Sequence, residues 1–130
     1  MDQDELRLEL GGADASYQRA LALEPGNAKF IANAAVLAAA LGRFEEAMTL
    51  DRRAVELDPL SVGVHNNLGL AAYYAGRLEE AAAALKKALE LNPEYPGAHT
   101  FLGQVYLAQA HAQEALAEME RENVRRTAAR

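Results

Sequence analysis

The chain has 130 residues, with 13 lysines and arginines against 19 aspartates and glutamates, which gives a formal charge of −6. Its 51% hydrophobic and 25% charged residues are typical of a folded protein, and its length fits one domain over residues 1–130. The acidic balance disfavours nucleic acid as a partner, because it repels phosphate. Cysteine is absent from the sequence, which excludes disulfides and thiolate ligands.

Neither end of the sequence resembles a targeting segment. Residues 1–10 lack the basic start and apolar core of an export signal. The most apolar stretch, residues 30–42, is shorter than the about 20 residues that a membrane-spanning helix needs. We therefore expect a cytoplasmic protein with no segment inserted in a membrane.

The clearest feature of the sequence is an internal repeat of 34 residues. Pro25, Pro59 and Pro93 follow this interval, and each closes a phrase similar to Ala-Leu-Glu-Leu-Asn-Pro. Other columns keep the same interval: Gly42 and Gly76, Arg43 and Arg77, His65 and His99, Gly69 and Gly103, and Glu46, Glu80 and Glu114. The chain is thus expected to be a stack of copies of one unit.

Each unit contains two helical runs. In the unit at residues 62–95, apolar residues recur every three or four positions on both sides of Gly76, which is the spacing of one helical face. Glycine readily adopts the left-handed backbone found just past a helix end, and Pro93 prevents the second helix from continuing. Small residues such as Ala47, Ala81 and Gly69 allow the two helices to approach closely. The pattern therefore predicts helical hairpins and an all-α fold.

These units resemble the tetratricopeptide repeat. The resemblance rests on Leu-Gly in the first helix, Gly-Arg-Leu-Glu-Glu-Ala at the turn and Ala-Leu-Glu-Leu-Asn-Pro at the end of the unit. It implies a right-handed superhelical solenoid of antiparallel helical hairpins, with about three and a half repeats. The expected units are a half repeat at about residues 12–25 and repeats at 28–61, 62–95 and 96–124, the last with a polar C-terminal end.

About seven helices follow from this division: a leading helix and three pairs. The expected pairs are residues 28–41 and 44–57, 62–75 and 78–91, and 96–109 and 112–124. The leading helix lacks a partner, so we expect residues 1–10, or the same end of a second copy, to cover Tyr17, Leu21 and Leu23.

Two positions depart from the pattern of the resembled family. Asp51 occupies a column that is usually large and apolar and that holds Leu85 in the next unit. A buried carboxylate is costly unless it is paired, so either the helix is rotated or Asp51 has a polar partner such as His65. Ala110 stands where glycine ends the earlier first helices. The polar end beyond it either caps the solenoid or marks the edge of a fragment of a longer chain.

Candidate catalytic and metal-binding residues have simpler explanations. His65 and His99 share one column without carboxylates at ligand spacing, which favours packing over metal binding. His111 is expected in an exposed turn. The glutamate pairs that begin at Glu45 and Glu79 lie in first helical turns, where negative charge is favourable. We therefore expect no catalytic, cofactor or metal site, and no enzymatic activity.

The resemblance implies a groove lined by the first helix of each hairpin. Family members that clamp an acidic chaperone C-terminus place paired basic residues there, whereas here only Lys29 and asparagines remain, so apolar or aromatic anchors are expected in the partner. We expect Tyr73, Tyr74 and Leu70 to dominate binding, with one of the two tyrosines packing between hairpins. The expected groove residues are Lys29, Asn33, Val36, Asn66, Asn67, Leu70, Tyr73, Tyr74, Thr100, Phe101, Gln104 and Leu107.

The function expected from the sequence is a non-catalytic scaffold that binds a peptide or helix of a partner protein in this groove. Two alternatives stay open. One is a self-assembling unit that forms a homo-oligomer, and the other is a segment of a larger regulatory or signalling protein.

Overall fold

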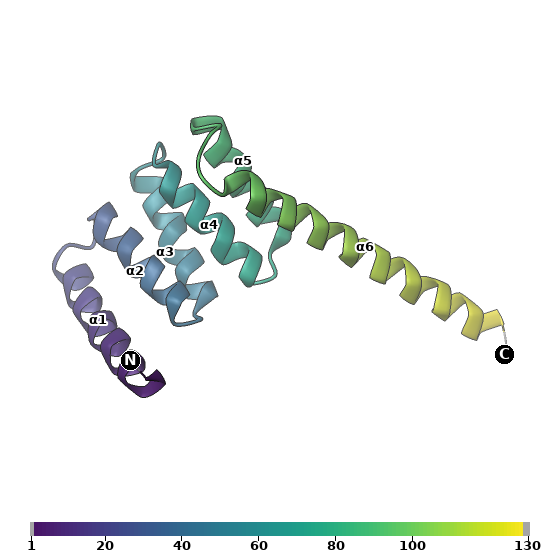
Figure 1. The fold of residues 1–130 in the computed structure, drawn as a ribbon, viewed down its shortest axis with the longest axis horizontal. Coiled ribbons are helices and arrows are strands. Elements are labelled where there is room, and N and C mark those ends of the chain that lie inside the picture. The colour runs from purple at the N-terminus through teal and green to yellow at the C-terminus, as the bar shows by residue number, and fades with distance from the viewer. Residues whose placement is uncertain (1, 129–130) are drawn as a thin grey trace.

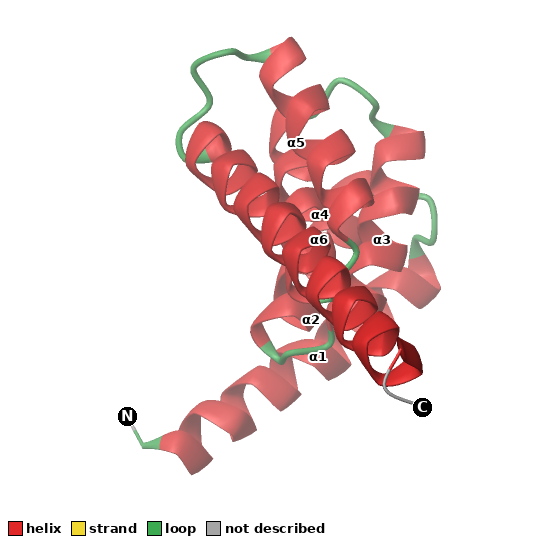
Figure 2. Ribbon diagram, turned by 90° about the vertical axis from the view of Figure 1, so that its right-hand side faces the viewer, coloured by secondary structure: helices red, strands yellow, loops and turns green. Residues whose placement is uncertain are grey.

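The computed structural model describes residues 2–128, whose regular elements are all helices joined by short loops (Figures 1 and 2). In chain order these are α1 (Gln3–Leu23), α2 (Ala28–Ala40), α3 (Phe44–Leu57), α4 (Val62–Tyr74), α5 (Leu78–Leu91) and α6 (Ala98–Ala128). The prediction of an all-helical solenoid is confirmed, and α2 to α5 begin and end within one residue of the predicted positions.

Local backbone geometry explains these boundaries. Gly42 and Gly76 have φ angles of +78° and +80°, which is the left-handed conformation predicted for the end of a first helix. The amide of the following arginine then bonds back across the turn, as in the 2.8 Å bond from Arg77 N to the Ala72 carbonyl. At the start of α2, the Asn27 side chain accepts a hydrogen bond from Phe30 N.

The helices pack as two hairpins, α2 with α3 and α4 with α5, flanked by α1 and α6. The first helices form one layer, because α2 contacts α4 and α4 contacts α6 directly. Within the described residues, the second helices α3 and α5 do not contact each other through their backbones. The array therefore bends towards the layer of α2, α4 and the start of α6. Met48, Leu68, Leu85 and Val105 fill the main core with surrounding alanines.

The closest helix crossing depends on Gly69. A Cβ atom added to Gly69 would lie 2.6 Å from Cγ of Leu85 and 3.4 Å from the Ala81 carbonyl oxygen. In α6, Gly103 holds the same repeat position but has nothing within 4 Å of such an atom. The described residues thus supply no helix to cover this position of α6.

The predicted final hairpin is wrong. Residues 98–128 form one continuous helix, and its C-terminal half projects away from the array (Figure 1). The physical reason is Ala110: alanine is the best helix former and resists the left-handed backbone that Gly42 and Gly76 adopt. His111 therefore lies within the helix, exposed, and not in a turn. The helix starts at Ala98, two residues later than predicted, after Gly97 with a φ of +83°.

The N-terminal expectation is also corrected. Residues 3–10 extend α1 as one helix, so they do not fold back on the half repeat. One face of α1 rests on α2, where Tyr17 and Leu21 are half-buried, while Leu23 is 84% exposed. No residue of α1 is fully buried. Within the described residues, α1 packs on α2 alone, and an ion pair of 3.0 Å from Arg43 to Asp14 adds to this contact.

The two glycines provide a matched pair of variants. Gly69→Ala should lower the free energy of unfolding by about 1–3 kcal/mol, because the new methyl group overlaps Leu85. Gly103→Ala should leave it unchanged or raise it by up to about 1 kcal/mol, because alanine favours the helix and meets no atom. Urea unfolding followed by circular dichroism measures both. Equal effects of the two variants would contradict this packing.

Candidate functional site

One hollow of the layer lies between α2, α3 and α4. Its volume is about 190 Å³. The polar residues that line it are Asp51 and Asn67, and the others are apolar or aromatic: Ala35, Val36, Ala39, Phe44, Leu70, Ala71 and Tyr74. We call this hollow the Asp51 pocket. Four predicted groove residues meet here, namely Val36, Asn67, Leu70 and Tyr74.

The pocket lies where the first hairpin differs from the second at matching repeat positions. In the second hairpin, the fully buried Leu85 fills the space against Gly69. One repeat earlier the corresponding residues are Asp51 and Ala35, and both line the pocket. Because aspartate is shorter than leucine, the space that a leucine side chain would fill is left open.

Asp51 is the unusual ionisable group of the structure. The residue is 2% exposed, and its Oδ1 atom is buried without a hydrogen-bond partner among the described residues. The expected rotation of α3 is therefore wrong. The expected pairing with His65 is absent as well, because His65 Nε2 lies 2.8 Å from the Pro59 carbonyl oxygen. Burial raises the pKa of Asp51 from 3.8 to about 7, since removal from water disfavours the charged form.

The structure separates the two tyrosines. Tyr73 is half-buried and packs against the main core, whereas Tyr74 is 58% exposed. The Tyr74 ring stacks on Phe44, with the ring centroids 5.3 Å apart and the planes inclined by 25°. It also meets the edge of Tyr73 at 5.3 Å. The exposed tyrosine of the layer is thus held in place by two aromatic contacts.

The other predicted groove residues lie outside this pocket. Lys29 and Asn33 line a second hollow near the start of α2. Asn66 is buried, and its Oδ1 has no partner among residues 2–128. Phe101 packs against the core from α6. On the same helix, Thr100, Gln104 and Leu107 are exposed.

The histidines support the start of two helices. His65 Nε2 and His99 Nε2 each lie 2.8 Å from the carbonyl oxygen of a proline six residues earlier, Pro59 and Pro93 respectively. The sequence predicted that these two histidines pack within the fold, and the structure shows that each contacts a backbone carbonyl. Each imidazole links the beginning of a first helix to the end of the preceding unit.

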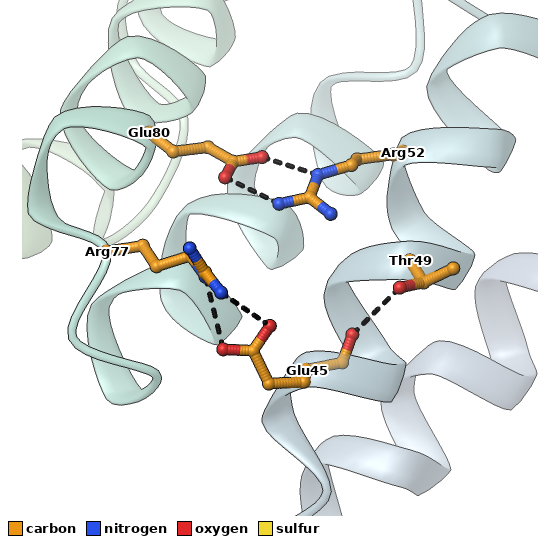
Figure 3. Close-up of polar contacts among 5 residues, drawn as sticks. All are labelled: Glu45, Thr49, Arg52, Arg77 and Glu80. Atoms are coloured by element: carbon orange, nitrogen blue, oxygen red, sulfur yellow. Dashed lines mark hydrogen bonds and ion pairs between the residues drawn. The ribbon is translucent and has the colours of Figure 1, made fainter.

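Ion pairs between neighbouring hairpins were missed by the sequence reasoning. Arg52 donates two hydrogen bonds of 2.7 Å to Glu80, and Arg77 donates to both carboxylate oxygens of Glu45 at 3.1 and 3.3 Å (Figure 3). The Arg52 guanidinium holds the pKa of Glu80 below its usual value. These glutamates therefore do more than favour a helix start: they join α3 to α5 through side chains.

Profiles of known families match the chain in two places. One, described as a tetratricopeptide repeat, covers residues 9–62, and another, described as a TPR repeat, covers residues 69–109. The chain belongs to the tetratricopeptide repeat family. No curated protein sequence matches it.

Several solved tetratricopeptide repeat structures are similar to this chain. An O-GlcNAc transferase mutant from Thermobaculum terrenum is 33% identical with a TM-score of 0.69, over 74% of this chain and 18% of the transferase chain. The first TPR of Spaghetti (RPAP3), solved with the HSP90 peptide SRMEEVD, is 25% identical with a TM-score of 0.75, over 80% and 82% of the two chains. MamA is 27% identical with a TM-score of 0.76, over 92% and 72%.

The described part of this tetratricopeptide repeat chain has neither a metal-ligand cluster nor a helix suited to a membrane. Residues 2–128 contain no group of three or more histidine, aspartate or glutamate side chains placed to hold a metal ion. None of the described helices has the length and apolar character required to cross a membrane.

The raised pKa of Asp51 predicts a specific pH dependence of stability. Between about pH 4 and pH 7 the folded chain keeps a proton that the unfolded chain has lost, so the free energy of unfolding should fall as the pH rises. From pH 5 to pH 8 this loss amounts to about 2.5 kcal/mol. Asp51→Asn should remove it, whereas Glu56→Gln, on the exposed side of α3, should retain it.

Urea unfolding of the three proteins at both pH values measures this effect. The comparison of variants separates the contribution of Asp51 from every other pH-dependent contribution to stability. If wild type and Asp51→Asn lose the same stability on going from pH 5 to pH 8, the carboxyl group is not buried as described.

Proposed function

We propose that this chain is a non-catalytic scaffold that binds a peptide or helix of a partner protein across α2, α4 and the start of α6. One observation carries the proposal: an open pocket with mostly apolar and aromatic walls lies on this layer, beside the exposed ring of Tyr74. Rigid aromatic side chains at such hollows typically supply much of the energy of binding. The RPAP3 structure, solved with a bound peptide, supports a peptide-binding function for this fold.

The chemistry of the layer favours a partner with apolar or aromatic anchors. The RPAP3 peptide SRMEEVD ends in acidic and apolar residues. Among the predicted groove residues here, Lys29 alone is basic, and it lies at the second hollow, away from the pocket. The pocket itself contains Asp51, which would repel a carboxylate. An acidic C-terminus is therefore a poor fit to this layer.

The tyrosine pair allows a direct test of the binding surface. Peptides that bind the intact chain are first selected from a random display library, and their affinities are then measured by fluorescence anisotropy. Tyr74→Ala should weaken binding at least tenfold, which corresponds to about 1.4 kcal/mol, because it removes an exposed aromatic anchor. Tyr106→Ala, an exposed tyrosine of α6 outside the pocket, should change the affinity less than twofold.

Thermal melting followed by circular dichroism provides the structural control. Tyr73→Ala should lower the melting temperature, because Tyr73 packs on the core, whereas Tyr74→Ala should melt near wild type. The proposal fails if no peptide is selected, or if the selected peptides bind Tyr74→Ala and wild type equally well.

Self-assembly is a second candidate function, which the open face of α6 favours. The described part of the chain leaves Gly103 without a covering helix, and Leu107, Leu116, Met119 and Val124 are each more than half exposed. Residues 112–124 were predicted to fold back over this face, yet they continue α6. The same residues of a second copy would cover the face, which amounts to an exchange of helices between two chains.

Restoring the missing turn tests this second candidate. Sedimentation velocity of the wild type should show a dimer at high protein concentration. Ala110→Gly should shift the equilibrium towards monomer, because glycine permits the left-handed turn and lets residues 112–124 fold back on their own chain. A wild type that stays monomeric at all concentrations would exclude self-assembly through α6.

A further inference from the structure

The Asp51 pocket combines a carboxyl group at its base with apolar walls. Asp51 is buried, with 2% of the residue exposed, yet it lines an open hollow. Its Oδ1 atom has no hydrogen-bond partner within residues 2–128. The Asn67 amide shares the pocket without bonding to it. A buried acceptor without a partner costs free energy, which a ligand that donates to it would recover.

The helices that pack on α3, namely α2 and α4, place no positively charged side chain at the Asp51 carboxyl group. On α2, Lys29 lines a different hollow, near the start of the helix. On α4, His65 is occupied by the Pro59 carbonyl, and Tyr73 packs on the core. Tyr74 is the titratable residue of α4 that lines the pocket with Asp51, and a phenol group supplies no positive charge.

The charged groups of α3 itself lie on its other faces. Arg52 is held by Glu80, and Arg53 donates to the Pro25 carbonyl. The acidic residues of this helix are outside the pocket as well: Glu45, Glu46 and Glu56. Within the described residues, Asp51 therefore has no salt-bridge partner.

We infer that the Asp51 pocket binds a lysine side chain of the partner peptide, with the ammonium group on the Asp51 carboxylate and the methylene stem between Val36, Leu70 and Tyr74. The inference rests on the proposed function and names one residue that the partner must contain. Lysine fits because it carries a compact charge with three donors at the end of an apolar stem. The net charge of −6 also favours a basic segment over an acidic one.

Binding of an ammonium group requires the charged form of Asp51 and is therefore linked to pH. With a pKa of about 7 in the free protein, about a tenth of the carboxyl groups are ionised at pH 6 and about nine tenths at pH 8. Lysine remains charged throughout this range. The affinity for a lysine peptide should thus be about tenfold higher at pH 8 than at pH 6.

Two short peptides test the inference. The first is acetyl-Ala-Leu-Lys-Leu-Ala-amide, and the second replaces lysine with norleucine, which keeps the stem and removes the charge. Titration of the ¹⁵N-labelled intact chain, followed through the amide shifts of Leu70 and Tyr74, gives both dissociation constants. At pH 8 the lysine peptide should bind wild type at least tenfold more tightly than the norleucine peptide.

Matched variants identify the carboxyl group responsible. In Asp51→Asn the preference for lysine and its pH dependence should disappear, whereas Glu56→Gln should behave like wild type. Equal binding of the two peptides to wild type overturns the inference and leaves the proposed function standing. Failure of both peptides also overturns the inference, and the display selection then decides separately whether the layer binds peptides at all.

Discussion

Close approach of paired helices is the constraint on which the rest of the structure depends. Leu85 fits against α4 because residue 69 has no side chain, and a single methyl group there would collide with Leu85 at 2.6 Å. In the α4–α5 hairpin a large residue thus packs directly on a position without a side chain. One repeat earlier the corresponding residues are Asp51 and Ala35, and both line an open pocket.

Two departures from the repeat pattern give the molecule its distinctive surfaces. In the first hairpin, Asp51 replaces the large residue, and the Asp51 pocket forms between α2, α3 and α4. In the last unit, Ala110 replaces the glycine of the turn, and α6 runs straight past the uncovered Gly103. Both surfaces therefore follow from single departures in an otherwise regular repeat, and they lie at separate places on the molecule.

The hairpins were predictable because several local signals agree at each boundary. The proline that ends a unit, the left-handed Gly42 and Gly76, and the apolar spacing all indicate the same helices. The predicted hairpin of the last unit is wrong because the other repeat positions continue there, whereas the glycine that ends a first helix is replaced by Ala110. The propensity of one residue for a helical backbone decided the outcome there.

The candidate site was predictable only in part. The resemblance to the tetratricopeptide repeat implied Val36, Leu70 and Tyr74 as groove residues, and in the structure all three line one pocket. Phe44 and Asp51 were not predicted for the groove, because they come from α3 and face it only through the packing of that helix. The ion pairs from Arg52 to Glu80 and from Arg77 to Glu45 also depend on the distance between hairpins. The available signal was the presence of residues of opposite charge at these positions of neighbouring repeats.

Asp51 is buried in an open pocket, and its Oδ1 atom has no partner among the described residues. The most direct measurement is the carboxyl ¹³C chemical shift of Asp51 in the free chain as the pH is raised. The structure predicts a titration midpoint near pH 7, because burial is the cause of the raised pKa. A midpoint near pH 4, the ordinary value for aspartate, would show that the carboxylate is solvated or paired and would contradict the account.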